Sequence, residues 1–191
     1  MPELPAMRYR RARVSDAEAI AALHADSWRR NYRGAYSDAF LDGDVFSDRL
    51  TVWTTRLRDR QVKERTTVAE TDEGLAGFVH TVSGADAEWG TLLDNLHVTH
   101  DLKRAGIGTQ LVARAAQALV VENGSEGLFL WVLEQNTAGQ AFYQRLGGTC
   151  VERDLVNPPG GKPERLAGNP ACLRYAWPEP SELLRWLDQR P

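Results

Sequence analysis

Cysteine is scarce in this sequence of 191 residues. The two cysteines, Cys150 and Cys172, are too few for a disulfide framework and lack the spacing of a metal site. No apolar run approaches the roughly 18 residues of a membrane span, and the N-terminus lacks the charged-then-apolar order of a signal peptide. We therefore expect a cytoplasmic protein with no metal and no membrane contact.

An excess of positive charge is also missing. Lys and Arg number 23 and Asp and Glu number 26, which gives a net charge of -3. This balance argues against a nucleic-acid partner bound by a broad basic face. A hydrophobic fraction of 42% with 26% charged residues is typical of globular proteins and excludes a largely disordered chain. With no repeat or low-complexity linker, residues 1–191 are expected to form one domain.

The hydrophobic pattern predicts alternating strands and helices. Strands are predicted at residues 9–14, 66–70, 75–81, 91–98, 128–133, 150–157 and 171–177. A first helix is predicted to begin at a capping box, Ser15–Glu18. Further helices are predicted at 47–59, 106–122 and 136–146, and a short terminal helix at 180–189. The order β-α-α-β-β-β-α-β-α-β-β predicts an α/β (α+β) fold, a mixed, mostly antiparallel central sheet with helices on both faces. A polar loop is expected at 83–90, and the Pro/Gly-rich segment 158–170 is long enough to indicate a functional surface.

The most informative stretch lies where the strand at 91–98 leads into the long helix. The connecting turn contains a basic pair, Lys103 and Arg104, and two glycines, Gly106 and Gly108. Glycines let the backbone approach a ligand closely, and the unpaired N–H groups and dipole of the helix start attract an anion such as pyrophosphate. The alternative is a merely tight connection. The spacing fits neither a Walker loop nor a dinucleotide fingerprint.

Two motifs resemble those of the GCN5-related N-acetyltransferase (GNAT) superfamily. The turn Lys103–Gly108 is similar to its acetyl-coenzyme A signature Gln/Arg-x-x-Gly-x-Gly/Ala, with Lys103 in place of the usual Gln or Arg. The segment Asn136–Gly148 is similar to its Asn-x-x-Ala-x-x-Phe-Tyr-x-x-x-Gly-Phe motif, with Gly139 and Gly148 at the positions of Ala and Phe. The motifs occur in the family's order, and the resemblance spans residues 9–177.

The resemblance implies an N-acetyltransferase that moves an acetyl group from acetyl-CoA to an amine. It also implies that the strand backbone pairs with the pantetheine arm of the coenzyme and that the turn binds its pyrophosphate. The residues expected to bind the cofactor are Leu96, His97, Val98, Lys103, Arg104, Ala105, Gly106, Ile107, Gly108, Thr109, Asn136 and Phe142. Asn136 is also expected to cap the helix that follows it.

Acetyl transfer requires a free amine, a stabilised carbonyl oxygen and a proton for the departing thiolate. Tyr143 matches the family's leaving-group tyrosine and is expected to be the general acid; the alternative is a core aromatic pair with Phe142. Asp94 is the candidate base, acting through water, and its alternative is binding of the substrate ammonium. Without a bulge, Asp94 would share a face with Leu96 and Val98, and His97 would point the other way as a packed histidine. A bulge, common on this strand in the family, would change that parity.

The acceptor is expected to be a primary amine of a small molecule or peptide. Trp28 and Tyr32 lie one helical turn apart and can line an amine pocket, although packing on the sheet is equally compatible with their spacing. Glu88, in the loop before the strand, is a further candidate for lining the cleft. Two questions stay open at this point. The chain could bind acetyl-CoA without turnover, as a sensor, and the apolar side of the terminal helix could cover a homodimer interface or the chain's own core.

Overall fold

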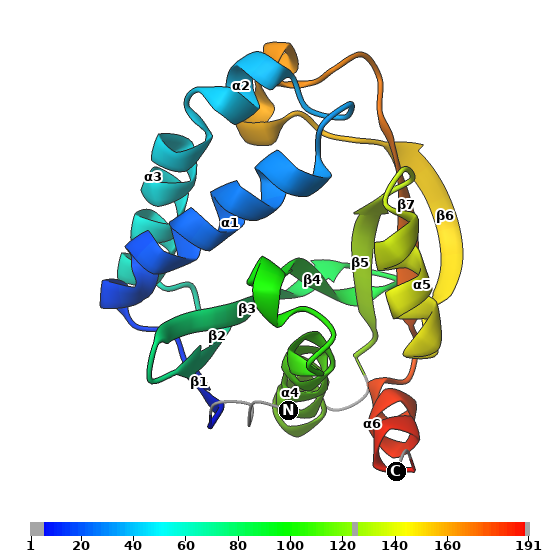
Figure 1. Ribbon diagram of the computed structural model, residues 1–191. Coiled ribbons are helices and arrows are strands. Elements are labelled where there is room, and N and C mark those ends of the chain that lie inside the picture. Colours follow the sequence, from blue (N-terminus) through cyan, green and yellow to red (C-terminus); the bar gives the residue numbers. More distant parts are fainter. Residues whose placement is uncertain (1–5, 124–125, 190–191) are drawn as a thin grey trace.

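The seven strands of the computed structural model, which describes residues 6–123 and 126–189, form a single sheet (Figure 1). The strands are β1 (Arg8–Arg11), β2 (Glu64–Thr71), β3 (Gly74–Asp86), β4 (Gly90–Val98), β5 (Leu128–Leu133), β6 (Thr149–Leu155) and β7 (Ala171–Trp177). Their order across the sheet is β1-β2-β3-β4-β5-β7-β6. Only the β4–β5 contact is parallel, so the sheet is mixed and mostly antiparallel, as predicted.

Helices cover both faces of this sheet. They are α1 (Ala17–Asn31), α2 (Asp38–Asp42), α3 (Val45–Arg58), α4 (Ile107–Asn123), α5 (Thr137–Arg145) and α6 (Pro180–Asp188). On one face, α1 and α3 enclose a core that includes Ile20, Trp53 and Phe78, each fully buried. On the other face, α4 buries Leu111 against the central strands, with Leu130 beneath it. The apolar stripe of each helix therefore faces the sheet, because burial of that stripe stabilises the layered arrangement.

The terminal helix α6 packs on the chain itself. Leu183 is 2% exposed, and Leu184, Trp186 and Leu187 are partly buried against the core beneath α4. The apolar side of this helix is thus occupied within the chain. No helix in the described ranges combines the length and apolar character needed to cross a membrane.

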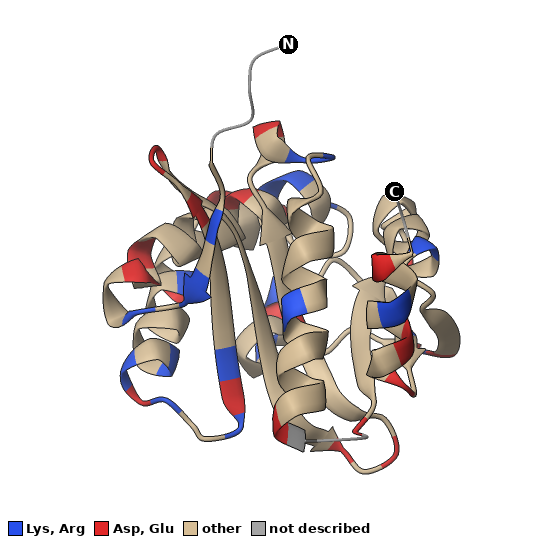
Figure 2. Cartoon of the chain, turned by 90° about the horizontal axis from the view of Figure 1, so that it is seen from below, with Lys and Arg blue, Asp and Glu red and all other residues tan. Residues whose placement is uncertain are grey.

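Charges of both signs are interspersed over the molecule. Figure 2 shows Lys and Arg segments alternating with Asp and Glu segments, in keeping with the net charge of -3. Within residues 6–123 and 126–189 no group of three or more His, Cys, Asp or Glu side chains is arranged to hold a metal ion. Cys150 is exposed, Cys172 is buried, and neither forms a disulfide.

Most predicted elements occur near their expected positions, but two local predictions are wrong and one short helix was not predicted. The polar loop expected at 83–90 is shorter, because β3 continues to Asp86. The short helix α2 was not predicted, because its sequence carries no strong helical signal. The capping box at Ser15–Glu18 does not form as predicted: the backbone N–H of Arg13 donates to Asp16 Oδ2 (2.6 Å), and Val14–Asp16 is a 3₁₀ turn that leads into α1. The helix α4 ends at Asn123, one residue beyond the predicted bound, and Gly124 lies outside the described residues.

The parallel pair β4–β5 separates soon after it begins. Only Thr91 with Leu128 and Leu92 with Phe129 are paired, although β4 continues to Val98 and β5 to Leu133. Figure 1 shows the two strands diverging from there. Beyond Leu92, the edge of β4 opposite β3 has no strand partner among the described residues, so its backbone N–H and C=O groups require another partner.

Candidate active site

The turn that opens α4 has an unusual backbone. Arg104 has a φ of 69° and Gly106 a φ of 80°, and Arg104 is the one non-glycine residue at positive φ in the described part of the chain. A left-handed conformation costs a non-glycine residue about 1 kcal/mol or more, and such residues cluster at functional sites. A Cβ added at Gly106 would meet no atom within 4 Å, so the space beside the turn is open.

The start of α4 presents free backbone donors at this turn. The N–H of Gln110 donates to the carbonyl of Gly106 (3.0 Å), so the N–H groups of residues 107–109 precede the helical ladder. With the positive end of the helix dipole, these groups form a site for an anion. Lys103 and Arg104 are exposed beside it, whereas the side chain of Ile107 is buried in the core and leaves only its backbone available. Ala105 and Thr109 are half-buried.

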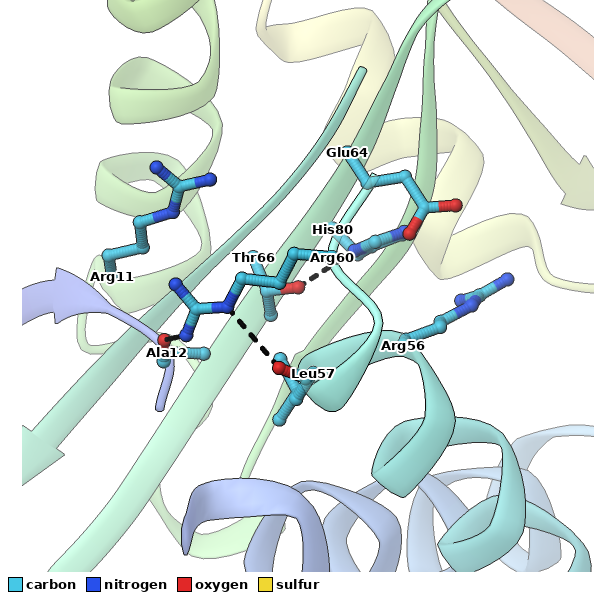
Figure 3. A pocket seen from close by; sticks show the side chains of 8 residues that line it. All are labelled: Arg11, Ala12, Arg56, Leu57, Arg60, Glu64, Thr66 and His80. Atoms are coloured by element: carbon cyan, nitrogen blue, oxygen red, sulfur yellow. Dashed lines mark hydrogen bonds between the residues drawn. The ribbon is translucent and has the colours of Figure 1, made fainter. Parts of the chain in front are cut away.

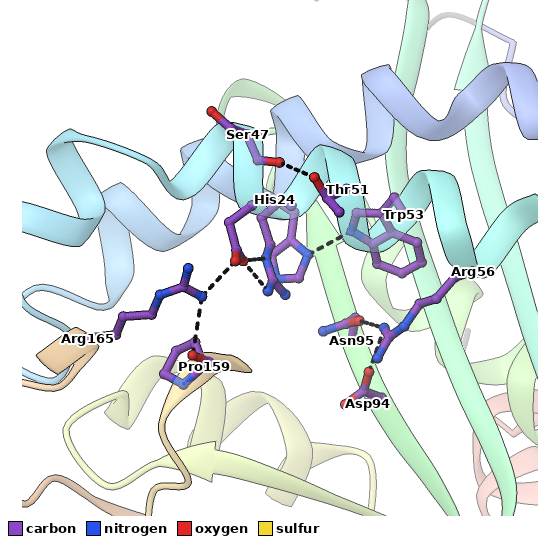
Figure 4. Close-up of polar contacts among 11 residues, drawn as sticks. His24, Ser47, Thr51, Trp53, Arg56, Asp94, Asn95, Pro159 and Arg165 are labelled. Carbon is purple, nitrogen blue, oxygen red and sulfur yellow. Dashed lines mark hydrogen bonds and ion pairs between the residues drawn. The ribbon is translucent and has the colours of Figure 1, made fainter. Parts of the chain in front are cut away.

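A β-bulge in β4 sets the direction of Asp94. Asn95 pairs with His80 and Leu93 with Thr81, so Asp94 is the extra residue. As a result Asp94 and Asn95 both face α3, where Nη1 of Arg56 donates to Asp94 Oδ2 (2.9 Å) and to Asn95 Oδ1 (3.2 Å) (Figure 4).

Because of the bulge, the side chains of β4 do not alternate between the two faces of the sheet as simple alternation predicts. Leu96 and Val98 pack toward the core beneath α4. Asp94 therefore lies on the opposite face from these two residues, and it shares the α1–α3 face with His97.

His97 is buried, as a packed histidine would be. Its side chain is 7% exposed, and its Nδ1 lies 2.8 Å from Ser27 Oγ on α1. Burial lowers the pKa of His97 to about 3; Asp94 opposes the shift, and Lys103 and Arg49 add to it. The ring also packs 4.5 Å from that of His24, whose Nδ1 accepts a hydrogen bond from Trp53 Nε1 (3.0 Å). Because its imidazole is neutral and enclosed, the His97 side chain shapes the site rather than carrying charge into it.

The second motif places its aromatic pair beside the phosphate turn. Asn136 caps α5, as predicted, with Oδ1 accepting the N–H of Gly139 (3.0 Å). A Cβ on Gly108 would lie 3.4 Å from the ring of Phe142, so the absence of a side chain there lets α5 approach the start of α4. The ring of Tyr143 is 5.2 Å from that of Phe142.

Three polar groups from separate elements converge where β4 and β5 diverge. Burial raises the pKa of the Tyr143 phenol above its ordinary value, and the nearby phenol of Tyr32 adds to the shift. Burial raises the pKa of Tyr32 to about 12, and the negative charge of Asp94 adds to that shift. Tyr32, from the end of α1, therefore lies close enough to interact electrostatically with both Tyr143 from α5 and Asp94 from β4.

A row of aromatic rings extends from Tyr32 toward α2. The ring of Tyr32 lies 5.5 Å from Trp28 and 5.0 Å from Tyr36, and Phe40 lies 6.2 Å from Trp28. Residues 28, 32, 36 and 40 are four apart, a spacing visible in the sequence, but the two rings beyond Tyr32 were not predicted because α1 ends at Asn31.

The segment 158–170 between β6 and β7 is attached to this aromatic row. Tyr36 forms a β-bridge with Leu166, and the N–H of Ser37 donates to the carbonyl of Arg165 (2.9 Å). Nη1 of Arg165 donates to Asp48 Oδ1 on α3 (2.6 Å). The Pro/Gly-rich segment thus packs against the aromatic row and α3, and its role as a functional surface stays a prediction.

Glu88 lies away from the convergence point. It is exposed in the turn that precedes β4, where its N–H donates to Asp86 Oδ1 (2.8 Å). The strand from Gly90 to Asp94, about 13 Å of extended chain, separates this turn from Asp94.

A small pocket lies on the other side of Arg56 (Figure 3). Its lining is Arg11, Ala12, Arg56, Leu57, Arg60, Glu64, Thr66 and His80. Its volume, about 10 Å³, corresponds to the site of one water molecule. Burial lowers the pKa of His80 to about 4, and Arg56 adds to the shift. Arg56 thus lines this pocket and also binds Asp94, and the pocket is too small for an organic substrate.

The arrangement has the features that a thioester donor of the coenzyme A type requires. An anion site lies at the start of α4, an unpaired strand edge can bind an amide-containing arm, and a protonated phenol stands at the divergence of β4 and β5. Of the sequence-predicted residues, the structure brings together Asp94, Tyr143 and Tyr32, and it leaves Glu88 apart. Arg56, Arg49, Arg165 and Tyr36 also belong to this region, and no motif marked the three arginines in advance.

Comparisons with known proteins agree with this geometry. Residues 18–148 match the model of the acetyltransferase (GNAT) family. An uncharacterized N-acetyltransferase of Bacillus subtilis, YuaI, is 26% identical over 187 residues, which covers 94% of this chain and 98% of that one.

Solved structures share the fold. The PaiA N-acetyltransferase of Thermoplasma acidophilum, crystallised with coenzyme A, has a TM-score of 0.67 at 19% identity, covering 90% of this chain and 99% of that one. NAA60 of Arabidopsis thaliana, crystallised with acetyl-CoA, has a TM-score of 0.63 at 16% identity, covering 90% and 98%. The chain belongs to the acetyltransferase (GNAT) family, and it is an acetyl-CoA-dependent N-acetyltransferase.

Proposed function

We propose that the enzyme transfers the acetyl group of acetyl-CoA directly to a primary amine of a small molecule or peptide, with Tyr143 as general acid. The convergence of Tyr143, Tyr32 and Asp94 beside the unpaired edge of β4 carries the proposal. The pyrophosphate binds the N–H groups at the start of α4, and the amides of the pantetheine arm pair with the free edge of β4.

The amine attacks the thioester carbonyl, forming a C–N bond. The neutral amine is the attacking species, and once the C–N bond has formed its nitrogen gives one proton to a water molecule that Asp94 helps to orient. The Asp94 side chain is 30% exposed, and only Oδ2 accepts from Arg56, so Oδ1 remains available to a water molecule. Arg56 fixes the carboxylate and offsets part of its charge. Asp94 is therefore suited to positioning water rather than to acting as a strong base.

Collapse of the tetrahedral intermediate breaks the C–S bond, and the sulfur takes a proton from Tyr143. The resulting phenolate takes a proton back from water, which balances the proton that the amine has lost. The raised pKa of Tyr143 keeps the phenol protonated and ready to donate. A thiol has an ordinary pKa of about 8.5 in water, below that of a phenol. The same burial disfavours a free thiolate, so transfer of the proton inside the site costs less than it would in water.

The test is the variant Tyr143→Phe, which removes the donor and retains the ring. Turnover, measured by release of the coenzyme thiol, should fall by about 100-fold, a typical contribution of general acid catalysis. The Kd for acetyl-CoA, measured by calorimetry, should stay within a factor of about two, because only a proton donor is lost.

Tyr9→Phe is the matched control. Tyr9 lies on β1 beneath Arg114, away from the convergence point, so both turnover and affinity should be retained. An unchanged turnover in Tyr143→Phe would refute the general-acid role, as would an equal loss of turnover and acetyl-CoA affinity.

A further inference from the structure

The guanidinium of Arg49, on α3, is buried yet retains an open donor. The residue is 8% exposed, and its Cζ lies 4.4 Å above the centre of the Trp28 ring. Both Nε (3.0 Å) and Nη2 donate to Asp48 Oδ2. Nη1 donates to none of the described residues. It is not sealed from solvent, so it can be reached. One nitrogen of the Arg49 guanidinium is therefore available to a ligand.

The local charges do not balance. Asp48 is shared, since its other oxygen, Oδ1, accepts from Nη1 of Arg165 (2.6 Å). The Cζ of Arg165 lies 4.4 Å above the ring of Phe40. Two stacked guanidinium groups thus share a single carboxylate, which leaves one positive charge in excess. Because burial disfavours charge that is not fully compensated, this excess positive charge favours the binding of an anion.

Neighbouring groups do not cancel this charge. Arg56 and Asp94 form their own ion pair (2.9 Å). His24 and His97 stay neutral: burial is the main cause of their lowered pKa values, and the charge of Arg49 contributes to both shifts.

Arg49 faces the same aromatic row that reaches the proposed transfer point. Its charge acts on the phenol of Tyr36. Tyr36 contacts Tyr32 (5.0 Å between ring centres), and Tyr32 in turn lies near Asp94 and Tyr143. A ligand held by Nη1 of Arg49 would lie along the aromatic wall that leads to the divergence of β4 and β5.

We propose that the acceptor amine also carries a carboxylate, as a free amino acid does, and that Arg49 binds this carboxylate while the amine reaches Asp94 and Tyr143. The inference rests on the proposed function and adds the substrate class. Arginine matches a planar carboxylate and keeps its charge when buried. The excess positive charge also lowers the pKa of a nearby ammonium, which increases the share of free amine without a strong base.

The test compares acceptors that differ only in the carboxylate. Each standard amino acid is paired with its carboxamide, and thiol release is measured for the wild type, Arg49→Gln and Arg49→Lys. A hydrogen bond to a charged group contributes about 1.5–3 kcal/mol, so the best acid should exceed its amide by roughly 10- to 150-fold in kcat/KM. In Arg49→Gln the KM of the acid should rise by a similar factor and that of the amide should stay unchanged. Arg49→Lys, which retains the charge and loses the fork, should lie between.

Arg185→Gln is the charge-matched control, since Arg185 is 68% exposed on α6. It should leave both acceptors unaffected. Equal losses for acid and amide in Arg49→Gln would assign Arg49 to packing and overturn the inference, and so would a wild-type preference for the amide. Peptides that begin with Glu or Gln form a further pair: preference for Glu there, without activity on free amino acids, would place the carboxylate on an N-terminal side chain.

Two further measurements separate this inference from the proposed function. If the wild type fails to bind acetyl-CoA in calorimetry, the proposed function is overturned. If acetyl-CoA binds and amines are acetylated, but Arg49→Gln does not discriminate acid from amide, only the carboxylate site is overturned. Titration of free amino acids and of the peptide that begins with Glu into the CoA-loaded enzyme covers slow turnover. Binding that Arg49→Gln abolishes supports the site, and absence of binding for all of these ligands refutes it.

Discussion

Moderately acidic conditions should destabilise this protein, because three of its four histidines are buried in the folded state. His24, His80 and His97 are 0%, 1% and 7% exposed. Burial lowers the pKa of each: to about 4 for His80, to about 3 for His97, and well below the ordinary value for His24. In the unfolded chain each returns to about 6.5. Between these values the unfolded state binds more protons, so the free energy of unfolding decreases as the pH falls.

The magnitude follows from the number of protons taken up. One pH unit below 6.5, each histidine that is neutral when folded and charged when unfolded lowers the free energy of unfolding by about 1.4 kcal/mol. Three such groups give about 4 kcal/mol between roughly pH 7.5 and 5.5. A typical domain has about 5–15 kcal/mol in total, so the loss is a large share of its stability. The carboxyl groups of Asp16 and Asp48 have lowered pKa values and titrate at lower pH, outside this window.

Urea unfolding followed by tryptophan fluorescence at several pH values in this window measures the slope. His80→Gln should remove about a third of it, since the amide can still bond to Thr66 Oγ1, which lies 2.8 Å from His80 Nδ1. His100→Gln, at an exposed position, is the control and should retain the full slope. A wild-type stability that does not change between roughly pH 7.5 and 5.5 would refute the assignment of these histidines as neutral in the folded protein.

Three further predictions concern single hydrogen bonds and one turn. Asn136→Ala should lower the free energy of unfolding by about 1 kcal/mol because the cap on Gly139 is lost, and Asn136→Ser should restore most of it; equal stability of all three would contradict the cap. Trp53→Phe should cost about 2 kcal/mol in urea unfolding, since it leaves both ring nitrogens of His24 without a partner, and a neutral result would count against that bond. Gly106→Ala should cost about 1 kcal/mol of stability through its φ of 80° and should weaken acetyl-CoA binding in calorimetry. Unchanged affinity in that variant would exclude the turn from the cofactor site.

The sequence was sufficient to predict the elements with strong hydrophobic periodicity. The strand Leu128–Leu133 has the predicted bounds, because a continuous apolar run buried on both faces has few alternatives. The helix α4 was predicted within about one residue at its start, since glycines precede it and a wide apolar stripe follows. The five-residue α2 and the extension of β3 to Asp86 depend on tertiary contacts rather than on a local pattern, so neither was predicted.

For the candidate site, motifs predicted the positions but not the directions of the side chains. The bulge at Asp94 reverses the parity of β4, and simple alternation could not determine which residue would be the extra one. Arg49 and Arg56 belong to a helix whose charges resembled an ordinary solvated surface. Only the packing of α3 against α1 and the docking of segment 158–170 show that Arg49 is buried against Trp28.

The position of β7 between β5 and β6 has a consequence for biosynthesis. The ribosome makes β6 before β7, yet β6 pairs only with β7 in the described sheet. Until Trp177 has been added, the nascent chain presents two open strand edges, on β5 and on β6, and Val151 and Leu155 of β6 stay exposed even in the finished fold. Such edges pair readily with other chains. During synthesis β7 can therefore join the sheet only after β5 and β6 have been made, and chains shortened before Ala171 should need a chaperone to remain in solution.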